Sequence, residues 1–100
     1  MSEAEFTRQV LALAKLLGWR TFHARAARTT KGWRTPVQGD GKGFADIVCV
    51  RERVLWIELK TDTGKLTPEQ NAWIRSLRGA DQEVHVWRPR DWPEIEKVLR

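Results

Sequence analysis

Two acids and a lysine stand out because they lie in otherwise apolar segments of the sequence. Asp46 interrupts the run 44–50, and Glu58 and Lys60 end the run 54–60. Both runs are short and rich in β-branched and aromatic residues, which is typical of strands. A charged side chain in such a run costs free energy unless another group compensates it. These three residues are therefore the first candidates for chemistry.

The spacing of the two runs predicts how the acids are placed. Only residues 51–53 separate the runs, so a β-hairpin is the simplest connection. If Val50 faces Val54 across this loop, Asp46 lies opposite Glu58. Side chains two positions apart share a face of a sheet, so the charged residues lie on one face while the apolar residues of the second run point to the other.

Opposed carboxylates suggest a metal site. They lie about 5 Å apart at Cβ and repel each other when both are ionised. A raised pKa or a bound cation relieves the repulsion. Mg²⁺ takes oxygen ligands, usually one or two carboxylates with waters and a substrate phosphate. We predict Mg²⁺, with Mn²⁺ able to substitute, bound by Asp46, Glu58 and the carbonyl of Leu59. Lys60 then lies beside the metal-bound water.

A less specific interpretation of the same residues is a solvated sheet face. A Glu58–Lys60 pair on such a face contributes little stability. Asp46 argues against this interpretation, because it interrupts a continuous hydrophobic run and an unpaired acid there needs a reason.

The composition limits the class of protein. One hundred residues suit a single domain, expected over 1–100, with a modest core. The net charge of +5 and the pI of about 10 fit an anionic partner such as nucleic acid. No stretch approaches the length needed to cross a bilayer. Cys49 is the only cysteine, so no internal disulfide forms and a cytoplasmic, intracellular protein is expected.

Periodicity and helix-capping residues predict the remaining elements. We expect, in chain order, a helix over 2–17, strands over 19–24, 44–50 and 54–60, a helix that begins at Thr67, a strand over 83–88 and a helix that begins at Asp91. Phe22 is expected to face the core. The order αβββαβ predicts an α/β fold with a mixed four-stranded sheet flanked by helices, in which the helix after the third strand makes a right-handed crossover.

The segment 25–42 shows no helical or strand period. It carries five basic residues against one acid, Asp40. A loop this long in a small domain is usually functional or disordered. Basic side chains can hold backbone phosphates, and an indole can stack on an unpaired base. The predicted DNA-binding residues are Arg25, Arg28, Lys31, Trp33, Arg34 and Lys42.

Four short motifs follow one another along the chain. They are Glu5 in the first helix, Gly43-Phe44-Ala45-Asp46, Glu58-Leu59-Lys60 and Thr67-Pro68-Glu69-Gln70. This order resembles the VRR-NUC branch of the PD-(D/E)xK nuclease superfamily. There, a glutamate on the first helix precedes Gly-x-Pro-Asp, Glu-x-Lys and Ser/Thr-x-x-Gln. Ala45 stands where the family usually has proline, which donates no ligand.

The resemblance implies a restriction-endonuclease-like fold and a metal-dependent nuclease. According to this resemblance, Asp46 and Glu58 bind the metal, Lys60 acts on the attacking water, and Glu5 and Gln70 approach the same site. On spacing alone, Glu5 can instead belong to a helix-capping box, and Gln70 can be only a cap. Small stand-alone members resemble phage-type enzymes that cut branched DNA such as Holliday junctions as homodimers, which implies a similar substrate and assembly here.

Both histidines are weaker candidates. His23 follows the first strand and could contact phosphate, but a lone histidine there is more often structural. His85 shares a strand face with Glu83 and Trp87, so a surface role is expected. Scattered histidines and one cysteine do not make a zinc site.

The sequence thus predicts a divalent-metal-dependent, structure-specific DNA endonuclease with no membrane or protein partner implied. One alternative is a non-catalytic basic module whose DNA binding depends on salt but not on Mg²⁺. Another is an interaction domain that does not bind DNA even at low salt. The Asp46 and Glu-x-Lys set favours catalysis, because a simple binder gains nothing from acids that face phosphate.

Overall fold

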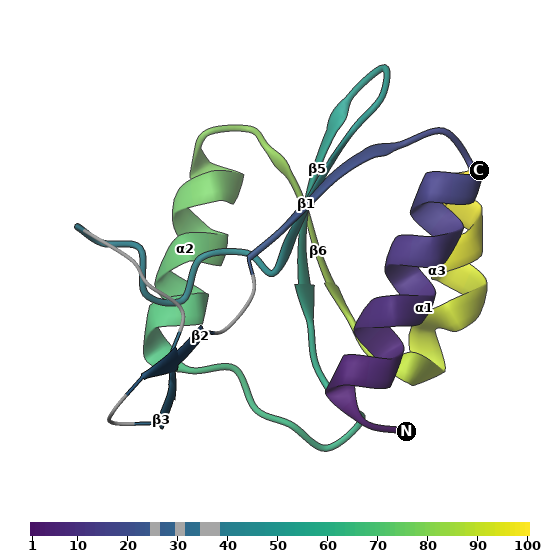
Figure 1. Cartoon of the computed structure of the whole chain (residues 1–100). Helices are drawn as coiled ribbons and strands as arrows, with labels where there is room; N and C mark the ends of the chain where they lie inside the picture. The colour runs from purple at the N-terminus through teal and green to yellow at the C-terminus, as the bar shows by residue number, and fades with distance from the viewer. Residues whose placement is uncertain (25–26, 30–31, 35–38) are drawn as a thin grey trace.

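A four-stranded sheet lies between helices on both of its faces (Figure 1). The computed structural model describes residues 1–24, 27–29, 32–34 and 39–100. In chain order the elements are α1 (Glu3–Leu16), β1 (Arg20–His23), β2 (Ala27–Thr29), β3 (Gly32–Arg34), β4 (Ile47–Val50), β5 (Val54–Leu59), α2 (Pro68–Gly79), β6 (Glu83–Trp87), the short 3-10 helix η1 (Pro89–Asp91) and α3 (Trp92–Leu99). Helix α2 covers one face of the sheet, and α1 with α3 covers the other.

The sheet is mixed, as the sequence predicts. Its strand order is β1-β4-β5-β6, with β1, β4 and β5 antiparallel and β6 parallel to β5. Val50 pairs with Val54 and Ile47 with Ile57, which confirms the predicted hairpin register. One further step along this register brings Asp46 opposite Glu58.

The two faces of β5 have different environments. Leu55, Ile57 and Leu59 are fully buried beneath α1 and α3, where they pack with Phe6 and Val10. This face is the apolar core predicted from the alternation. The opposite face of β5 carries Glu58 and points toward α2.

The core also encloses the single cysteine. Cys49 is fully buried, and this burial raises the pKa of its thiol to about 11. The side chain therefore packs as a small hydrophobic residue. None of the helices in the described part of the chain is long and apolar enough to cross a membrane.

The prediction for Phe22 is wrong. Its side chain is 60% exposed, whereas Trp19 just before β1 is buried and donates its indole N–H to the carbonyl of Leu99 at 2.9 Å. Since β1 is an edge strand, only the face that carries Thr21 and His23 meets α1. Helix α2 lies over the opposite edge of the sheet and leaves Phe22 uncovered.

The segment 25–42 contains an element that the sequence did not predict. Strands β2 and β3 pair as a separate antiparallel hairpin, with Arg28 opposite Trp33. Each strand has three residues, which is too short for an alternating pattern to be recognised. Strand β4 also begins at Ile47, three residues later than predicted, because the chain before it makes a turn in which Phe44 N–H donates to Gly41.

Candidate active site

The predicted acid pair lies at the end of the sheet. Asp46 directly precedes β4, and its Oδ2 accepts a hydrogen bond from the main-chain N–H of Leu59 at 2.8 Å. This bond ties the carboxylate to the last residue of β5. Glu58 is only 3% exposed, and its carboxyl group is close enough to that of Asp46 to share a hydrogen bond when one of them carries a proton. The structure therefore brings both predicted carboxyl groups together.

Glu58 has strongly perturbed acidity. Burial, the negative charge of Asp46 and the hydrogen bond between the two carboxyl groups raise the pKa of Glu58 to about 9, while the positive charge of Lys60 opposes the rise. Without a cation, a proton therefore relieves the repulsion between the acids. A strongly perturbed carboxyl group beside a specific charge partner is typical of a functional site.

Gln70 has two roles that the sequence presented as alternatives. Its side-chain oxygen accepts a hydrogen bond from the N–H of Thr67 at 2.9 Å and completes the capping box at the start of α2. Its side-chain nitrogen donates to Glu58 Oε1 at 2.6 Å. Because the two ends of one amide serve the two partners, Gln70 caps the helix and orients the buried acid at once.

A close approach of two backbones places Gln70 beside the acids. Gly43 has φ +83°, and a Cβ at this position would lie 2.6 Å from the carbonyl carbon of Glu69 and 2.7 Å from the nitrogen of Gln70. Only glycine fits both the backbone angle and the space. Gly43 thus lets the start of α2 pack against the loop that leads to Asp46.

Lys60 follows β5 and is half-buried beside the acids. Its N–H donates to the carbonyl of Trp87 at 3.0 Å, which continues the parallel pairing with β6. Its positive charge opposes the rise in the pKa of both Glu58 and Glu3, which burial and Asp46 cause. The guanidinium of Arg88 donates to the carbonyls of Thr61 and Gly64 at 2.5 and 2.6 Å and so holds the turn that follows the lysine.

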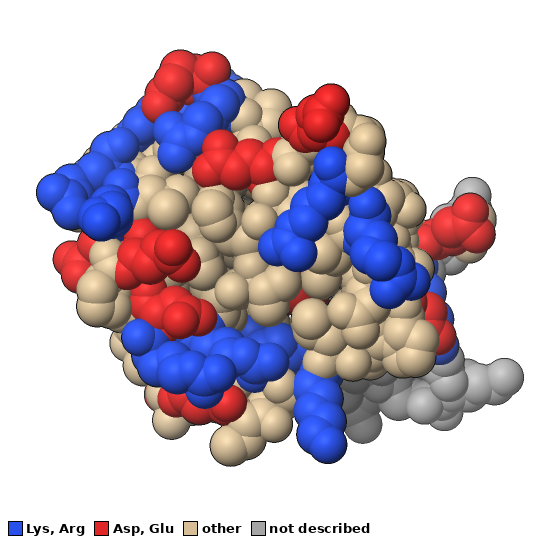
Figure 2. Space-filling view, turned by 180° about the vertical axis from the view of Figure 1, so that it is seen from behind, with Lys and Arg blue, Asp and Glu red and all other residues tan. Residues whose placement is uncertain are grey.

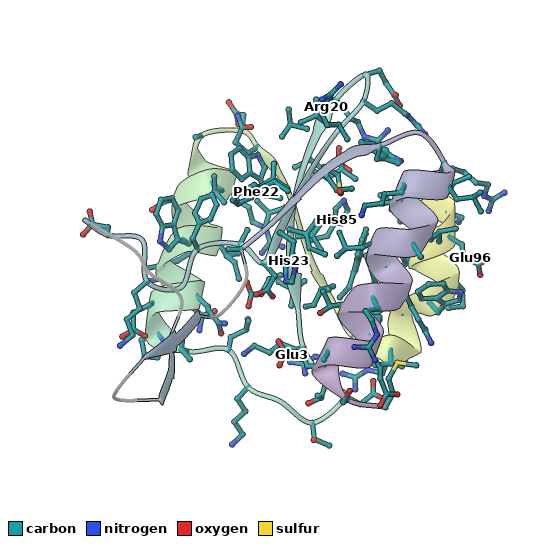
Figure 3. All side chains as sticks on the ribbon, in the orientation of Figure 1. Glu3, Arg20, Phe22, His23, His85 and Glu96 are labelled. Atoms are coloured by element: carbon teal, nitrogen blue, oxygen red, sulfur yellow. The ribbon has the colours of Figure 1, made fainter. Side chains whose placement is uncertain are left out.

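The first helix contributes Glu3 to this region, a residue that the sequence analysis missed. Burial and the charge of Asp46 raise the pKa of Glu3. Figure 3 shows Glu3 on α1 and His23 on β1 extending into the region between α1 and the sheet, and both line a cavity that reaches Asp46. Glu5 is exposed, and its backbone N–H donates to Ser2 Oγ at 3.1 Å. Ser2 therefore caps the helix, as in one half of the capping box that the spacing allows.

A helix-periodicity signal could have pointed to Glu3. It precedes the fully buried Phe6 by three residues and Thr7 by four, so it lies on the side of α1 that turns toward the sheet. Glu5 lies two residues further, about 200° around the helix axis.

The predicted DNA-binding residues are only partly covered by the structure. Arg25 and Lys31 lie outside the described residues, and only the backbone positions of Arg28, Trp33 and Arg34 are described, in β2 and β3. Lys42 is described. Its ammonium lies 3.4 Å from the carboxylate of Glu69, and its side chain is 80% exposed.

His85 packs as the sequence predicts. Its Nε2 lies 2.8 Å from a carboxylate oxygen of Glu83, and its ring stacks on Trp87 with centroids 4.9 Å apart. His85 therefore belongs to a packed surface of β6 and not to the acid pair.

The chemistry of the donor set fits a hard divalent cation. Among the described residues, no three His, Cys, Asp or Glu side chains gather closely enough to enclose a metal. Two carboxylates and a backbone carbonyl are a suitable set for an ion such as Mg²⁺ that keeps several waters. In an extended strand the N–H and C=O of one residue point to the same neighbour. Because the N–H of Leu59 points to Asp46, its carbonyl faces the same side.

Comparison with known proteins identifies one relationship. A family model described as "VRR-NUC domain" matches residues 9–91, which include the acid pair, Lys60 and Gln70. Glu3 and Glu5 precede the matched region. Neither the curated proteins nor the solved structures gave a significant match.

Proposed function

The chain belongs to the VRR-NUC family of PD-(D/E)xK nucleases, and from this premise we propose that it is a divalent-metal-dependent endonuclease that hydrolyses phosphodiester bonds in branched DNA. We propose that residues 1–100 act as one nuclease domain. The observation that carries the proposal is the pair of half-buried Asp46 and buried Glu58, with Lys60 beside it.

The acid pair is suited to replace its shared proton by a cation. In our proposal Asp46, Glu58 and the carbonyl of Leu59 hold a Mg²⁺ or Mn²⁺ ion. When bound, such an ion lowers the pKa of a coordinated water and neutralises charge on the phosphate. The hydrogen bond from Leu59 N–H holds the Asp46 carboxylate in place, and the one from Gln70 holds that of Glu58.

Lys60 supplies positive charge beside the acid pair. Its ammonium interacts with the acid cluster from a half-buried position, where the low dielectric strengthens its field. It orients the attacking water or stabilises the charge that develops on the phosphate oxygens. A non-catalytic DNA-binding module would have no use for this acid pair, which favours hydrolysis over simple binding.

The preference for branched DNA and the homodimer rest on the resemblance to small stand-alone members of the family. Cutting both strands of a four-way junction requires two sites, which a two-fold dimer supplies. The basic residues of segment 25–42 are proposed to contact the DNA backbone beside the site.

A cleavage panel tests this proposal. Labelled four-way junction, flap, duplex and single-stranded DNA are incubated with the protein in Mg²⁺, in Mn²⁺ and in excess EDTA. We expect cleavage with either metal, fastest on the junction, and none in EDTA or with the Asp46→Ala variant. Equal cleavage in EDTA, or an active Asp46→Ala variant, overturns the metal-dependent mechanism, and equal rates on all substrates overturn the preference for branched DNA.

The structure favours Glu3 over Glu5 as the acid that α1 adds to this site. We expect Glu3→Gln to slow cleavage by about tenfold, because it removes a carboxylate that interacts with Asp46 and Lys60. Glu5→Gln should change the rate by less than about twofold, because Glu5 does not line the cavity that holds Glu3 and Asp46 and its backbone N–H alone takes part in the helix cap. Single-turnover cleavage rates measure both. The reverse order of effects would restore the original prediction for Glu5.

A further inference from the structure

We propose that the cleft between α1 and β1 binds the sugar-phosphate backbone of the DNA strand that enters the acid site. This inference rests on the proposed nuclease function and adds a second phosphate-binding surface, apart from segment 25–42. It is carried by the shape of the cleft, by the distribution of charge along it and by side chains to which no role has yet been assigned.

The cleft is open and continuous with the acid pair. Its volume is about 670 Å³. One wall is the side of α1 that carries Glu3, Arg8 and Lys15, and the other wall is formed by Thr21 and His23 of β1. Asp46 lies near Glu3, at the first turn of α1. The cleft therefore runs along α1 from Lys15 near its last turn to Asp46 near its first turn.

Charge changes sign along the cleft. Glu3 and Asp46 are the only acids among its described lining residues, and both lie at the acid site. Away from that end the wall carries Arg8 and Lys15, both exposed and in no ion pair with the described residues. A basic wall that ends in a metal-binding acid pair suits a phosphate backbone whose one reacting phosphate lies over the metal.

Several basic residues elsewhere on the fold form ion pairs with neighbouring acids. Arg53 pairs with Glu83 at 2.8 Å, and Arg90 pairs with Asp62 at 3.7 Å. On the face seen from behind, basic and acidic side chains lie next to one another (Figure 2). Arg8 and Lys15, by contrast, form no ion pair with the residues that the structure describes, and both line the cleft that reaches Asp46.

The spacing along α1 matches a nucleic-acid strand. Arg8 and Lys15 are seven positions apart, which corresponds to about 10 Å along the helix axis. Successive nucleotides of one strand rise about 3.4 Å in duplex DNA, so the two side chains can reach phosphates about three nucleotides apart.

His23 lies in the cleft beside the strand that follows Asp46. It pairs across the sheet with Ile47, the residue that follows Asp46, and its half-buried ring faces α1. We assign it to the phosphate adjacent to the one that is cut. From the sequence, His23 could contact phosphate, although a lone histidine after a strand is more often structural. The fold places it in the cleft.

The salt dependence of DNA binding tests the proposal. Binding of a fluorescent four-way junction and a fluorescent duplex is measured by anisotropy in EDTA, over a range of salt concentrations, for the unmodified protein and the Arg8→Gln/Lys15→Gln variant. Each lost phosphate contact should reduce the slope of log K against log salt by about 0.7–0.9. The double variant should therefore lose about 1.4–1.8 in slope, or about 25- to 60-fold in affinity at 0.1 M salt if both proteins bind equally at 1 M.

A charge-matched variant separates this effect from net charge. Arg75→Gln/Lys97→Gln also removes two exposed positive charges, from α2 and α3. We expect its slope to stay within about 0.3 of the unmodified protein. Equal slopes for the two double variants overturn the proposal. Because binding is measured without metal, this result is independent of cleavage, so an inactive protein with the predicted slopes would refute the nuclease function and leave the phosphate-binding cleft standing.

Discussion

We expect the Glu58→Gln variant to lose about a thousandfold or more in cleavage rate while the metal-free protein becomes more stable. The amide cannot supply the negative charge that a divalent ion needs, and a loss of about 4 kcal/mol of transition-state stabilisation corresponds to this factor. The stabilising effect arises because the amide removes an ionisation that burial and Asp46 oppose. An activity loss with a stability gain separates a functional acid from a structural one.

The stabilising effect should depend on pH. The pKa of Glu58 is raised from 4.5 to about 9 in the folded protein. Its contribution to stability is therefore fully present below pH 4.5 and is lost as the pH rises toward 9. Gln carries no such titration. At pH 7 we expect Glu58→Gln to gain about 1–3 kcal/mol, or several degrees in melting temperature, and to gain little at pH 5.

Thermal unfolding in EDTA at pH 5, 7 and 8 measures this effect. Glu52→Gln is the matched control, because a hydrogen bond from Arg51 lowers the pKa of Glu52 to about 2. The stability that Glu52 contributes is present above the ordinary pKa of a glutamate and is lost as the pH falls through the lowered pKa. The Glu52→Gln variant should therefore not gain stability at neutral pH. A Glu58→Gln variant that is destabilised at every pH would mean that the carboxyl group serves only the fold.

Gly43→Ala should destabilise the protein by about 2–4 kcal/mol and also impair cleavage. The substitution combines the strain of a positive φ with a Cβ that would lie 2.6 Å from the backbone of Glu69. To relieve this contact α2 must move away, which draws Gln70 from its 2.6 Å hydrogen bond with Glu58. Denaturant unfolding and single-turnover cleavage measure the two effects.

Gly18→Ala is the control for this substitution. Gly18 also has a positive φ, +88°, but a Cβ there meets nothing within 4 Å. We expect a cost of about 1 kcal/mol from the backbone angle alone and no change in the chemical step. If both variants lose the same stability and retain cleavage, the close approach of Gly43 to α2 does not position the site.

The hairpin illustrates what short-range patterns can predict. Three residues between two apolar runs, together with alternation along them, give the register that pairs Val50 with Val54. This register puts Asp46 opposite Glu58 without any knowledge of the remaining fold. The prediction succeeded because the side-chain period of a strand is two, so that a slip of one residue would bury the acids in the core.

The first helix illustrates where such patterns fail. The sequence pointed to Glu5, whereas the structure turns Glu3 toward Asp46. Two residues on a helix differ by about 200° in direction, so the choice depends on how the helix is rotated against the sheet. That rotation is fixed by the packing of Phe6, Val10 and Ala14 in the core.

The sequence by itself determined the order of the main helices and strands, the mixed sheet and the acid pair with its lysine, because these follow from periodicities of a few residues and from helix caps. It did not predict the β2–β3 hairpin. Only the tertiary structure decided that Gln70 serves both a cap and Glu58, that Gly43 admits the start of α2, and that His23 shares a cleft with Glu3. Each of these contacts joins elements far apart in the chain. Their geometry depends on how helices pack on the sheet, and no local pattern encodes that packing.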